Sequence, residues 1–151
     1  MKVGAAGHLK VGAGLMFDVV KSQQGATLRA SLESFYRGVF ENPDTLHDFL
    51  AESCVQHVGP MALNHAQIVK HVLHVRACVQ KIEYSVADAI AHDDTIADRH
   101  IVTLTLHDGR SAVLELLCFI RIAGGKIVEL YESSQVLSGD QALGALATAS
   151  E

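Results

Sequence analysis

Glu132, Arg99 and His57 are the residues of this sequence that are best suited to acid/base chemistry. Glu132 lies in the stretch GGKIVELYESSQ, residues 124–135, where the apolar face of a strand would otherwise continue. Burial of a carboxyl group among apolar side chains raises its pKa towards the pH at which a general base works best. The guanidinium of Arg99 suits carboxylate or enolate oxygens, and an imidazole such as that of His57 relays protons near neutral pH. This set predicts the removal and return of a proton next to a carbonyl group, which needs no cofactor.

Each of these residues also has a purely structural interpretation. Glu132 would then pair with Arg99 or remain hydrated at the mouth of a pocket. Asp88 is expected opposite Arg99, either as an ordinary cross-strand ion pair or to orient Arg99 towards an oxyanion. His57 would bond to the backbone at the end of its strand. The sequence leaves these alternatives open.

The other histidines and the cysteines give weaker signals. His71 and His74 are three residues apart on an expected helix, a spacing that places two metal ligands together. A catalytic zinc needs three protein ligands, however, and no third one is evident. Cys118 is expected to be an inert buried thiol, because aliphatic surroundings raise the pKa of a cysteine. The sequence therefore predicts no metal site and no cysteine nucleophile.

Composition narrows the class of protein. With 151 residues, 49% of them apolar and 19% charged, the chain is expected to be globular, with one main folded domain. The net charge of −5 and the lack of a basic run argue against nucleic acid as a partner. No apolar run reaches the ~18 residues of a membrane span. Three cysteines without CxxC spacing predict no disulfide framework and a reducing, cytoplasmic location.

The positions of the apolar residues predict helices followed by a sheet. Helical periodicity covers residues 26–43 and 44–53, and a third helix over 64–79 begins with a capping-box pattern, Asn64 and Gln67. A short strand is expected at 54–59, and alternation predicts four antiparallel strands at 82–91, 95–107, 111–122 and 126–136. The fold class is α+β, with the helices on one face of the sheet. Residues 1–25 are expected to be a loosely ordered extension, with Met16 as an alternative start, and residues 138–151 a C-terminal tail.

Two turns set the expected register of the sheet. A two-residue turn at Asp108-Gly109 would pair His107 with Arg110, and a glycine turn at 123–125 would pair Ile122 with Lys126. The face towards the helices would then hold Val86, Asp88, Arg99, Ile101, Thr103, Leu114, Leu116, Cys118, Ile120, Val128, Leu130, Glu132 and Ser134. The opposite face would hold Asp98, His100, Val102, Glu115, Leu117, Phe119, Arg121, Glu129 and Tyr131. A slip of one residue in either turn reverses this assignment.

An apolar ligand pocket follows from these faces. Besides Glu132 and Arg99, its expected lining is Tyr36, Tyr84, Asp88, Ile101, Leu116, Cys118, Leu130 and Ser134. An apolar wall with a few charged groups is typical of a small-molecule site. The two tyrosines would point their hydroxyl groups into the cavity or would simply be amphipathic core residues.

Residues 26–137 resemble the nuclear transport factor 2-like superfamily, and within it the SnoaL-like proteins, which include polyketide cyclases. The stretches FIRIAGGKIVELYESSQ and VQHVGP carry this resemblance. It implies a cystatin-like fold, in which a curved, mostly antiparallel sheet forms a cone covered by about three N-terminal helices. It further implies an apolar pocket inside the cone and a homodimer formed through the outer face of the sheet.

The resemblance carries over to function only in part. The acid/base Asp of the cyclases falls on Glu132, but its partner histidine falls on Cys118, near which the oxyanion-binding acid of ketosteroid isomerases also maps. Of the Asp–Arg–Asp set of limonene epoxide hydrolases, Arg99 and Glu132 match two members and Ile101 occupies the third place. The leading expectation is a cyclase or isomerase. The alternatives are a non-catalytic ligand-binding or assembly domain and an epoxide hydrolase.

Overall fold

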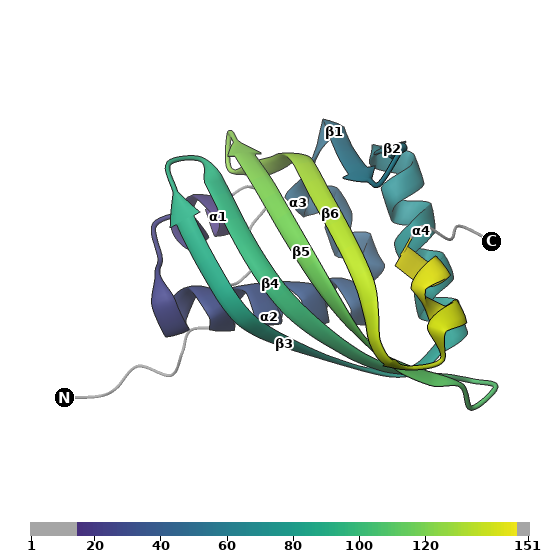
Figure 1. Ribbon diagram of the computed structural model, residues 1–151. Helices are drawn as coiled ribbons and strands as arrows, with labels where there is room; N and C mark the ends of the chain where they lie inside the picture. Colours follow the sequence, from purple (N-terminus) through teal and green to yellow (C-terminus); the bar gives the residue numbers. More distant parts are fainter. Residues whose placement is uncertain (1–14, 148–151) are drawn as a thin grey trace.

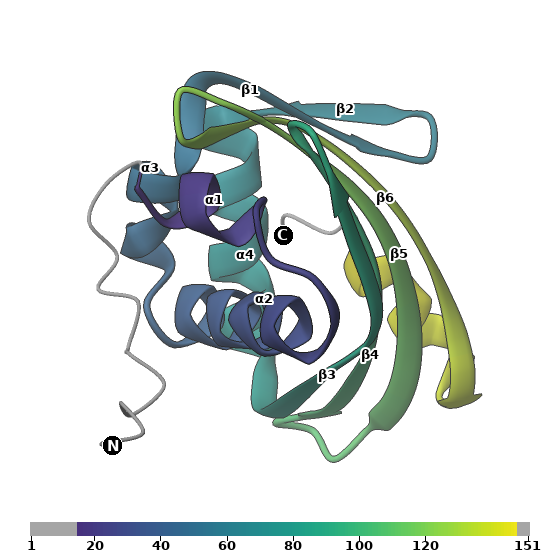
Figure 2. The same ribbon diagram turned by 90° about the vertical axis from the view of Figure 1, so that its left-hand side faces the viewer.

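A computed structural model describes residues 15–147, which form one curved sheet with helices packed in its hollow (Figures 1 and 2). The elements are α1 (Leu15–Val20), α2 (Gly25–Glu41), η1 (Pro43–Thr45), α3 (Leu46–Phe49), β1 (Leu50–Val58), β2 (Met61–Asn64), α4 (His65–Cys78), β3 (Val79–His92), β4 (Thr95–Leu106), β5 (Ser111–Ala123), β6 (Lys126–Gly139) and η2 (Gln141–Ala147). The expected α+β class is therefore confirmed.

The six strands lie in the order β2-β1-β6-β5-β4-β3. All neighbours are antiparallel except β1 and β6, which run parallel. The sheet curves around the helices without closing (Figure 2), and β2 and β3 are its edges. Among the described residues, no helix is long and apolar enough to cross a membrane.

The helices begin and pack as their sequences predict. On α2, Leu28, Leu32, Phe35 and Val39 are buried at helical spacing. The capping box of α4 is formed: Gln67 N donates to Asn64 Oδ1 at 3.0 Å, and Asn64 N donates to Gln67 Oε1 at 2.9 Å. These two helices form the wall that faces the concave side of the sheet.

Part of the expected N-terminal extension and part of the expected C-terminal tail are folded. Phe17 and Val20 of α1 are fully buried, and the Phe17 ring meets Phe35 edge to face at 5.0 Å. At the other end η2 buries Leu143. The expectation of a loose extension is therefore wrong for α1, because two large apolar residues one turn apart reach the core; residues 1–14 lie outside the described part of the chain.

The β4–β5 loop overturns the expected face of β4. Leu106 N donates to Arg110 O at 2.8 Å, which makes the loop three residues long, and Gly109 takes a positive φ of 90°. Such a loop, a turn followed by a left-handed glycine, is a common alternative to the two-residue turn. The register moves by one residue, so Asp98 and His100 face the helices while Arg99, Ile101 and Thr103 face outwards.

The faces of β5 and of β6 from Glu129 onwards were predicted correctly although their register was not; at the start of β6 the buried residue is Ile127 and not Val128. Ile122 pairs with Ile127 rather than Lys126, and an irregularity at Val128 shifts the ladder once more, so that Cys118 lies opposite Glu132. Two shifts of one residue restore the original face. Glu132 therefore points into the cone, as expected.

The β3–β4 pairing was predicted correctly but its face was not. Asp88 lies opposite Arg99, as expected. Both residues lie on the outer face, and a bulge between Val86 and Asp88 keeps Val86 buried on the inner side.

Candidate active site in the cone

A cavity of about 200 Å³ lies between the concave face of the sheet and helices α2 and α4. Most of its lining is aliphatic or aromatic. Its polar or titratable members are Tyr36, Gln56, His71, Tyr84, His100, Cys118 and Glu132. An apolar cavity with a few converging polar groups is the usual form of a small-molecule site.

Glu132 on β6 is held by Gln56 on β1. Gln56 Nε2 donates a hydrogen bond of 2.6 Å to Glu132 Oε2. Burial raises the pKa of the Glu132 carboxyl, and the nearby Asp98 carboxylate adds to this; the charge of His100 and the bond from Gln56 act in the opposite direction. The burial contribution is the largest, so the net pKa is raised and Glu132 holds its proton to a higher pH than a free glutamate does.

Asp98 and His100 form a buried pair on β4. Their side chains are 0% and 3% exposed, and His100 Nδ1 lies 2.6 Å from Asp98 Oδ1. Since a carboxylate can only accept, Nδ1 carries the proton of this bond and Nε2 becomes the nitrogen available for chemistry. The Tyr36 hydroxyl donates to the other Asp98 oxygen, and the Tyr36 ring stacks on His100 at 4.2 Å. The imidazole is thus fixed in both position and orientation.

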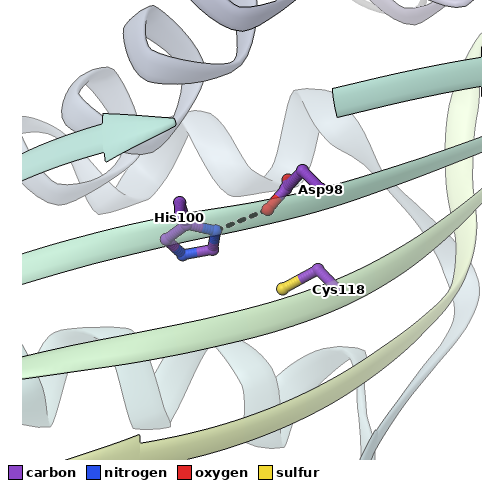
Figure 3. A group of neighbouring side chains, drawn as sticks. All are labelled: Asp98, His100 and Cys118. Carbon is purple, nitrogen blue, oxygen red and sulfur yellow. Dashed lines mark hydrogen bonds and ion pairs between the residues drawn. The ribbon is translucent and has the colours of Figure 1, made fainter. Parts of the chain in front are cut away.

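Cys118 on β5 completes a buried trio with this pair (Figure 3). One potential metal-ligand atom from each of the three residues lies within 4.8 Å of the other two. Burial, followed by the carboxylates of Glu132 and Asp98, raises the pKa of the Cys118 thiol well above its usual value. A metal ligand must be a thiolate, and Asp98 already accepts bonds from Tyr36 and His100, so the trio is better described as a hydrogen-bonded network beside a neutral thiol.

The two pocket tyrosines are neutral hydroxyl groups. Burial raises the pKa of both Tyr36 and Tyr84 well above the usual value for a phenol. Their rings stack with centroids 5.9 Å apart. Tyr84 therefore offers a hydroxyl, not a phenolate, to a ligand.

The structure brings together six of the eleven residues predicted for the site. Those that line the cavity are Glu132, Tyr36, Tyr84, Leu116, Cys118 and Leu130. The other five, Arg99, His57, Asp88, Ile101 and Ser134, do not line it. Ser134 shares the inner face of β6 with Glu132 but lies one row further along the sheet.

The residues outside the cavity have structural partners. Arg99 pairs with Asp88 at 2.8 Å and with Glu115 at 3.1 Å on the outer face. The His57 ring stacks on Tyr131 at 4.3 Å. The expectation that Arg99 lies in the pocket is wrong because the β4 register differs by one residue. The prediction of a cross-strand Asp88–Arg99 pair is confirmed.

Asp98, His100, Gln56 and His71 are the pocket or supporting residues that the sequence analysis missed. The alternation Ile96-Asp98-His100-Val102-Leu104 in the sequence already carries an apolar face with two polar residues set in it. His71 falls three residues after Ile68, so the helical stripe of α4 also includes it. The expected two-residue turn placed Asp98 and His100 on the outer face of the sheet, and the polarity of histidine placed His71 on the polar side of its helix.

Solved structures share this fold. AclR of Streptomyces galilaeus, a candidate hydroxylase, is 18% identical with a TM-score of 0.64, covering 80% of this chain and 83% of its own. Wild-type IdmH of Streptomyces antibioticus, a candidate polyketide cyclase, is 20% identical with a TM-score of 0.56, covering 66% of this chain and 88% of its own. A candidate isomerase from Rhodopseudomonas palustris is 16% identical with a TM-score of 0.62, covering 75% and 93%. At these identities the likeness shows the fold alone.

The sequence itself gives the family. No curated protein matches the chain significantly. The model of the SnoaL-like domain matches residues 29–130, from the first turns of α2 to the strand that carries Glu132. The chain therefore belongs to the family of SnoaL-like domains, within the nuclear transport factor 2-like superfamily.

Proposed function

We propose that this protein is a cofactor-independent enzyme that transfers a proton on an apolar carbonyl compound, as a cyclase or an isomerase. The observation that carries the proposal is that Glu132 and His100 line the same cavity. Two groups able to exchange protons line one apolar cavity, and each is held by a partner, Gln56 for the carboxyl and Asp98 for the imidazole. An acid and a base on the same cavity are what proton transfer next to a carbonyl group requires.

The roles follow from charge and position. Glu132, as the carboxylate, takes the proton from the carbon next to the carbonyl. Protonated His100 donates a hydrogen bond from Nε2 to the carbonyl oxygen, where negative charge develops, and Asp98 stabilises the imidazolium. For isomerisation Glu132 then returns its proton at another carbon of the enolate. For cyclisation the enolate carbon attacks a second carbonyl of the same molecule, and Glu132 gives its proton to the alkoxide oxygen that forms there. The raised pKa of Glu132 makes its carboxyl a better proton acceptor than that of a free glutamate, which suits a group that takes and returns a proton.

His100 also bears on the rival interpretation, a non-catalytic binding domain. The main argument for a binding domain is Cys118, which occupies the position of the partner histidine of related cyclases. Asp98 lies directly opposite Cys118, and His100 follows two residues later on the same face. An imidazole from the neighbouring strand thus stands beside the position where the family histidine is missing, which favours catalysis.

An epoxide hydrolase is less well supported. The set expected for it needs the guanidinium of Arg99 next to Glu132. Arg99 lies on the outer face, bound to Asp88 and Glu115, while Glu132 lies on the inner face.

We further propose a cytoplasmic homodimer formed through the outer face of the sheet. Leu117, Phe119 and Tyr131 are 49%, 57% and 41% exposed on neighbouring positions of β5 and β6. The pair Arg121–Glu129 borders them with both signs of charge, so a second copy turned by two-fold symmetry presents matching groups. The three cysteines are free thiols, as suits a reducing compartment.

The experiment that tests the catalytic proposal is proton exchange in D₂O. Alicyclic and polycyclic ketones are incubated with the protein in the presence of EDTA, and loss of the proton signal next to the carbonyl is followed by NMR. Exchange should be catalysed by the wild type and reduced by at least about 100-fold in Glu132→Gln, the usual contribution of a general base. Glu52→Gln, which changes an exposed carboxylate on β1, is the control and should retain activity.

Binding of the same ketones distinguishes an enzyme from a non-catalytic binding domain. Glu132→Gln should still bind them, because the cavity is mostly apolar. Wild type that binds ketones but exchanges no protons would overturn the enzyme and support the binding domain.

A further inference from the structure

The titratable groups proposed for catalysis lie in one region of the sheet. Asp98, which supports His100, forms a single row across β4, β5 and β6 with Cys118 and Glu132. On one side of this row Ile96 and Ile120 are fully buried in the core. Leu50 and Leu130 also line the cavity on this side, but most of the strand residues that line it lie on the other side of the row.

That other side is mostly apolar, although Tyr84 on β3, opposite Val102, also lines the cavity there. Successive inward positions there are Val102 and Leu104 on β4 and Leu114 on β5, all of which line the cavity. Leu114 is four residues from Cys118, or about 13 Å at the rise of a β-strand. A ligand that places its reacting carbonyl at the polar row thus has an apolar portion of roughly this length to lay along β4 and β5.

The C-terminal segment closes the apolar end. β1 pairs with β6 only as far as Glu132, so the second half of β6 lacks a strand neighbour on that side. η2 occupies this place, between β6 and α4 (Figure 1). Leu143 is buried in the cluster that contains Val102, Leu104 and Leu114, and Leu146 packs against the same cluster and lines the cavity.

Local contacts fix η2 in this position. Gly139 turns the chain with a φ of 89°, and a Cβ there would lie 2.4 Å from Ser111 O. Asp140 N donates to Ser111 O at 2.9 Å, and Asp140 Oδ1 accepts from Ala142 N at 2.9 Å. Gly144 lets η2 approach Val136 closely, since a Cβ would be 3.3 Å from its Cγ2. The segment is therefore built into the pocket as a fixed wall.

We infer that η2 is the end wall of the ligand site and that Leu146 sets the length of the apolar portion of the ligand. The ligand class is a carbonyl compound with an extended hydrocarbon part, oriented with its oxygen at Glu132 and His100 and its apolar end against Leu146. The family model ends at residue 130, so this wall lies outside the part of the fold that the family match covers. The orientation rests on the proposed function; the position of the wall does not.

A series of phenyl alkyl ketones tests this, from acetophenone through butyrophenone and hexanophenone to decanophenone. Binding to the full chain is measured by titration calorimetry or by amide chemical shifts. Affinity for wild type should rise roughly 4-fold with each methylene group buried and stop rising once the alkyl end reaches Leu146. Leu146→Ala should move this limit to longer ketones, and Leu146→Phe should move it to shorter ones.

Leu137→Ala is the matched control, because Leu137 is exposed on β6. It should leave the limit unchanged. The phenylalanine variant keeps the apolar packing of η2, so it serves if the alanine variant fails to fold. The same limit in wild type and both Leu146 variants would overturn the inference, as would failure of the wild type to bind any of the ketones. If the length limit shifts in the Leu146 variants but no ketone undergoes proton exchange, the assignment of η2 as the end wall stands and only the proposed catalysis is refuted.

Discussion

Asp98 and Glu132 lie in the same row of the sheet, one on each side of Cys118. The two carboxyl groups are separated by a single intervening strand, and only that of Glu132 lines the cavity. Their environments differ: Asp98 accepts bonds from His100 and Tyr36, whereas Glu132 accepts one from Gln56. Asp98, which accepts two hydrogen bonds, supports the imidazole of His100. Glu132, which accepts one, is the carboxyl group that can exchange a proton.

Asp98→Asn should destabilise the protein by about 1.5–3 kcal/mol, the usual contribution of a hydrogen bond to a charged group. The amide keeps the shape but removes the charge that both Tyr36 and His100 contact. Asp88→Asn is the matched control on the outer face, where its partner Arg99 is exposed, and should change stability little. Urea unfolding of both variants checks this, and ¹⁵N NMR of His100 should show a changed tautomer only in Asp98→Asn. Equal effects of the two substitutions would show that the buried pair has no special role.

The raised pKa of Glu132 predicts a specific dependence of stability on pH. A carboxyl group with a higher pKa in the folded than in the unfolded state binds more protons when folded. Below the pKa of the unfolded state this group therefore does not lower the stability of the folded protein. As the pH rises from the unfolded pKa to the folded pKa, the free energy of unfolding falls. Glu132→Gln removes this titration, so its stability should fall less than that of wild type across the same window.

Urea unfolding at a series of pH values measures the effect, with Glu52→Gln, at an exposed position on β1, as the control that keeps the wild-type slope. Titration of the Glu132 carboxyl carbon by ¹³C NMR gives the pKa directly. A normal or lowered value would contradict both the stability profile and the proposed role as a base.

Most of the fold was predictable because it depends on local patterns. The stripe of α2, the capping box at Asn64 and the change to an alternating period each stand in a short stretch of sequence. The burial of Phe17 was not predictable in this way, since α1 is only six residues long and is held by tertiary contacts with Phe35 and Phe49.

The site was only half predictable because it depends on register. The face of Glu132 was predicted correctly because two one-residue shifts add to two residues, which keeps the face, whereas the single shift at β4 moved Arg99 to the opposite face. The choice between a two-residue and a three-residue loop at Gly109 involves a small difference in local free energy, yet it exchanges Arg99 for His100 in the pocket. Packing of the whole face settles it: the observed register buries Ile96, Val102, Leu104 and Leu106 together.

The three thiols should differ in reactivity. Burial raises the pKa of Cys54 to about 11 and that of Cys118 well above its usual range, and both are buried, whereas Cys78 is only half-buried near His74. Since the thiolate is the reactive form, iodoacetamide at pH 8 should label Cys78 first and the other two only after unfolding. Mass spectrometry of the native protein checks this. Rapid labelling of Cys118 would indicate an ionised thiol and reopen its use as a metal ligand or nucleophile.

Phe119→Asp should convert the proposed dimer into a monomer, because it places a charge in the middle of the exposed apolar group on the outer face. Light scattering after size exclusion gives the mass. Leu73→Asp is the matched control, since Leu73 is similarly exposed on α4. A wild-type mass of one chain, or dissociation by both substitutions, would contradict the proposed interface.

Gly139→Ala should be more destabilising than Gly124→Ala. Both glycines have positive φ, 89° and 59°, so each substitution brings left-handed strain of about 1–2 kcal/mol. Only at Gly139 does the new methyl group meet backbone, Ser111 O at 2.4 Å and Ala112 Cα at 2.8 Å, while nothing lies within 4 Å at Gly124. The clash should add about 1–3 kcal/mol, measured as the difference between the two variants in urea. Relief of this clash would displace Asp140 and η2. In Gly139→Ala the affinity should therefore no longer stop rising sharply at the ketone length that Leu146 sets. Equal stability losses and an unchanged limit would show that η2 is held by its apolar side chains alone.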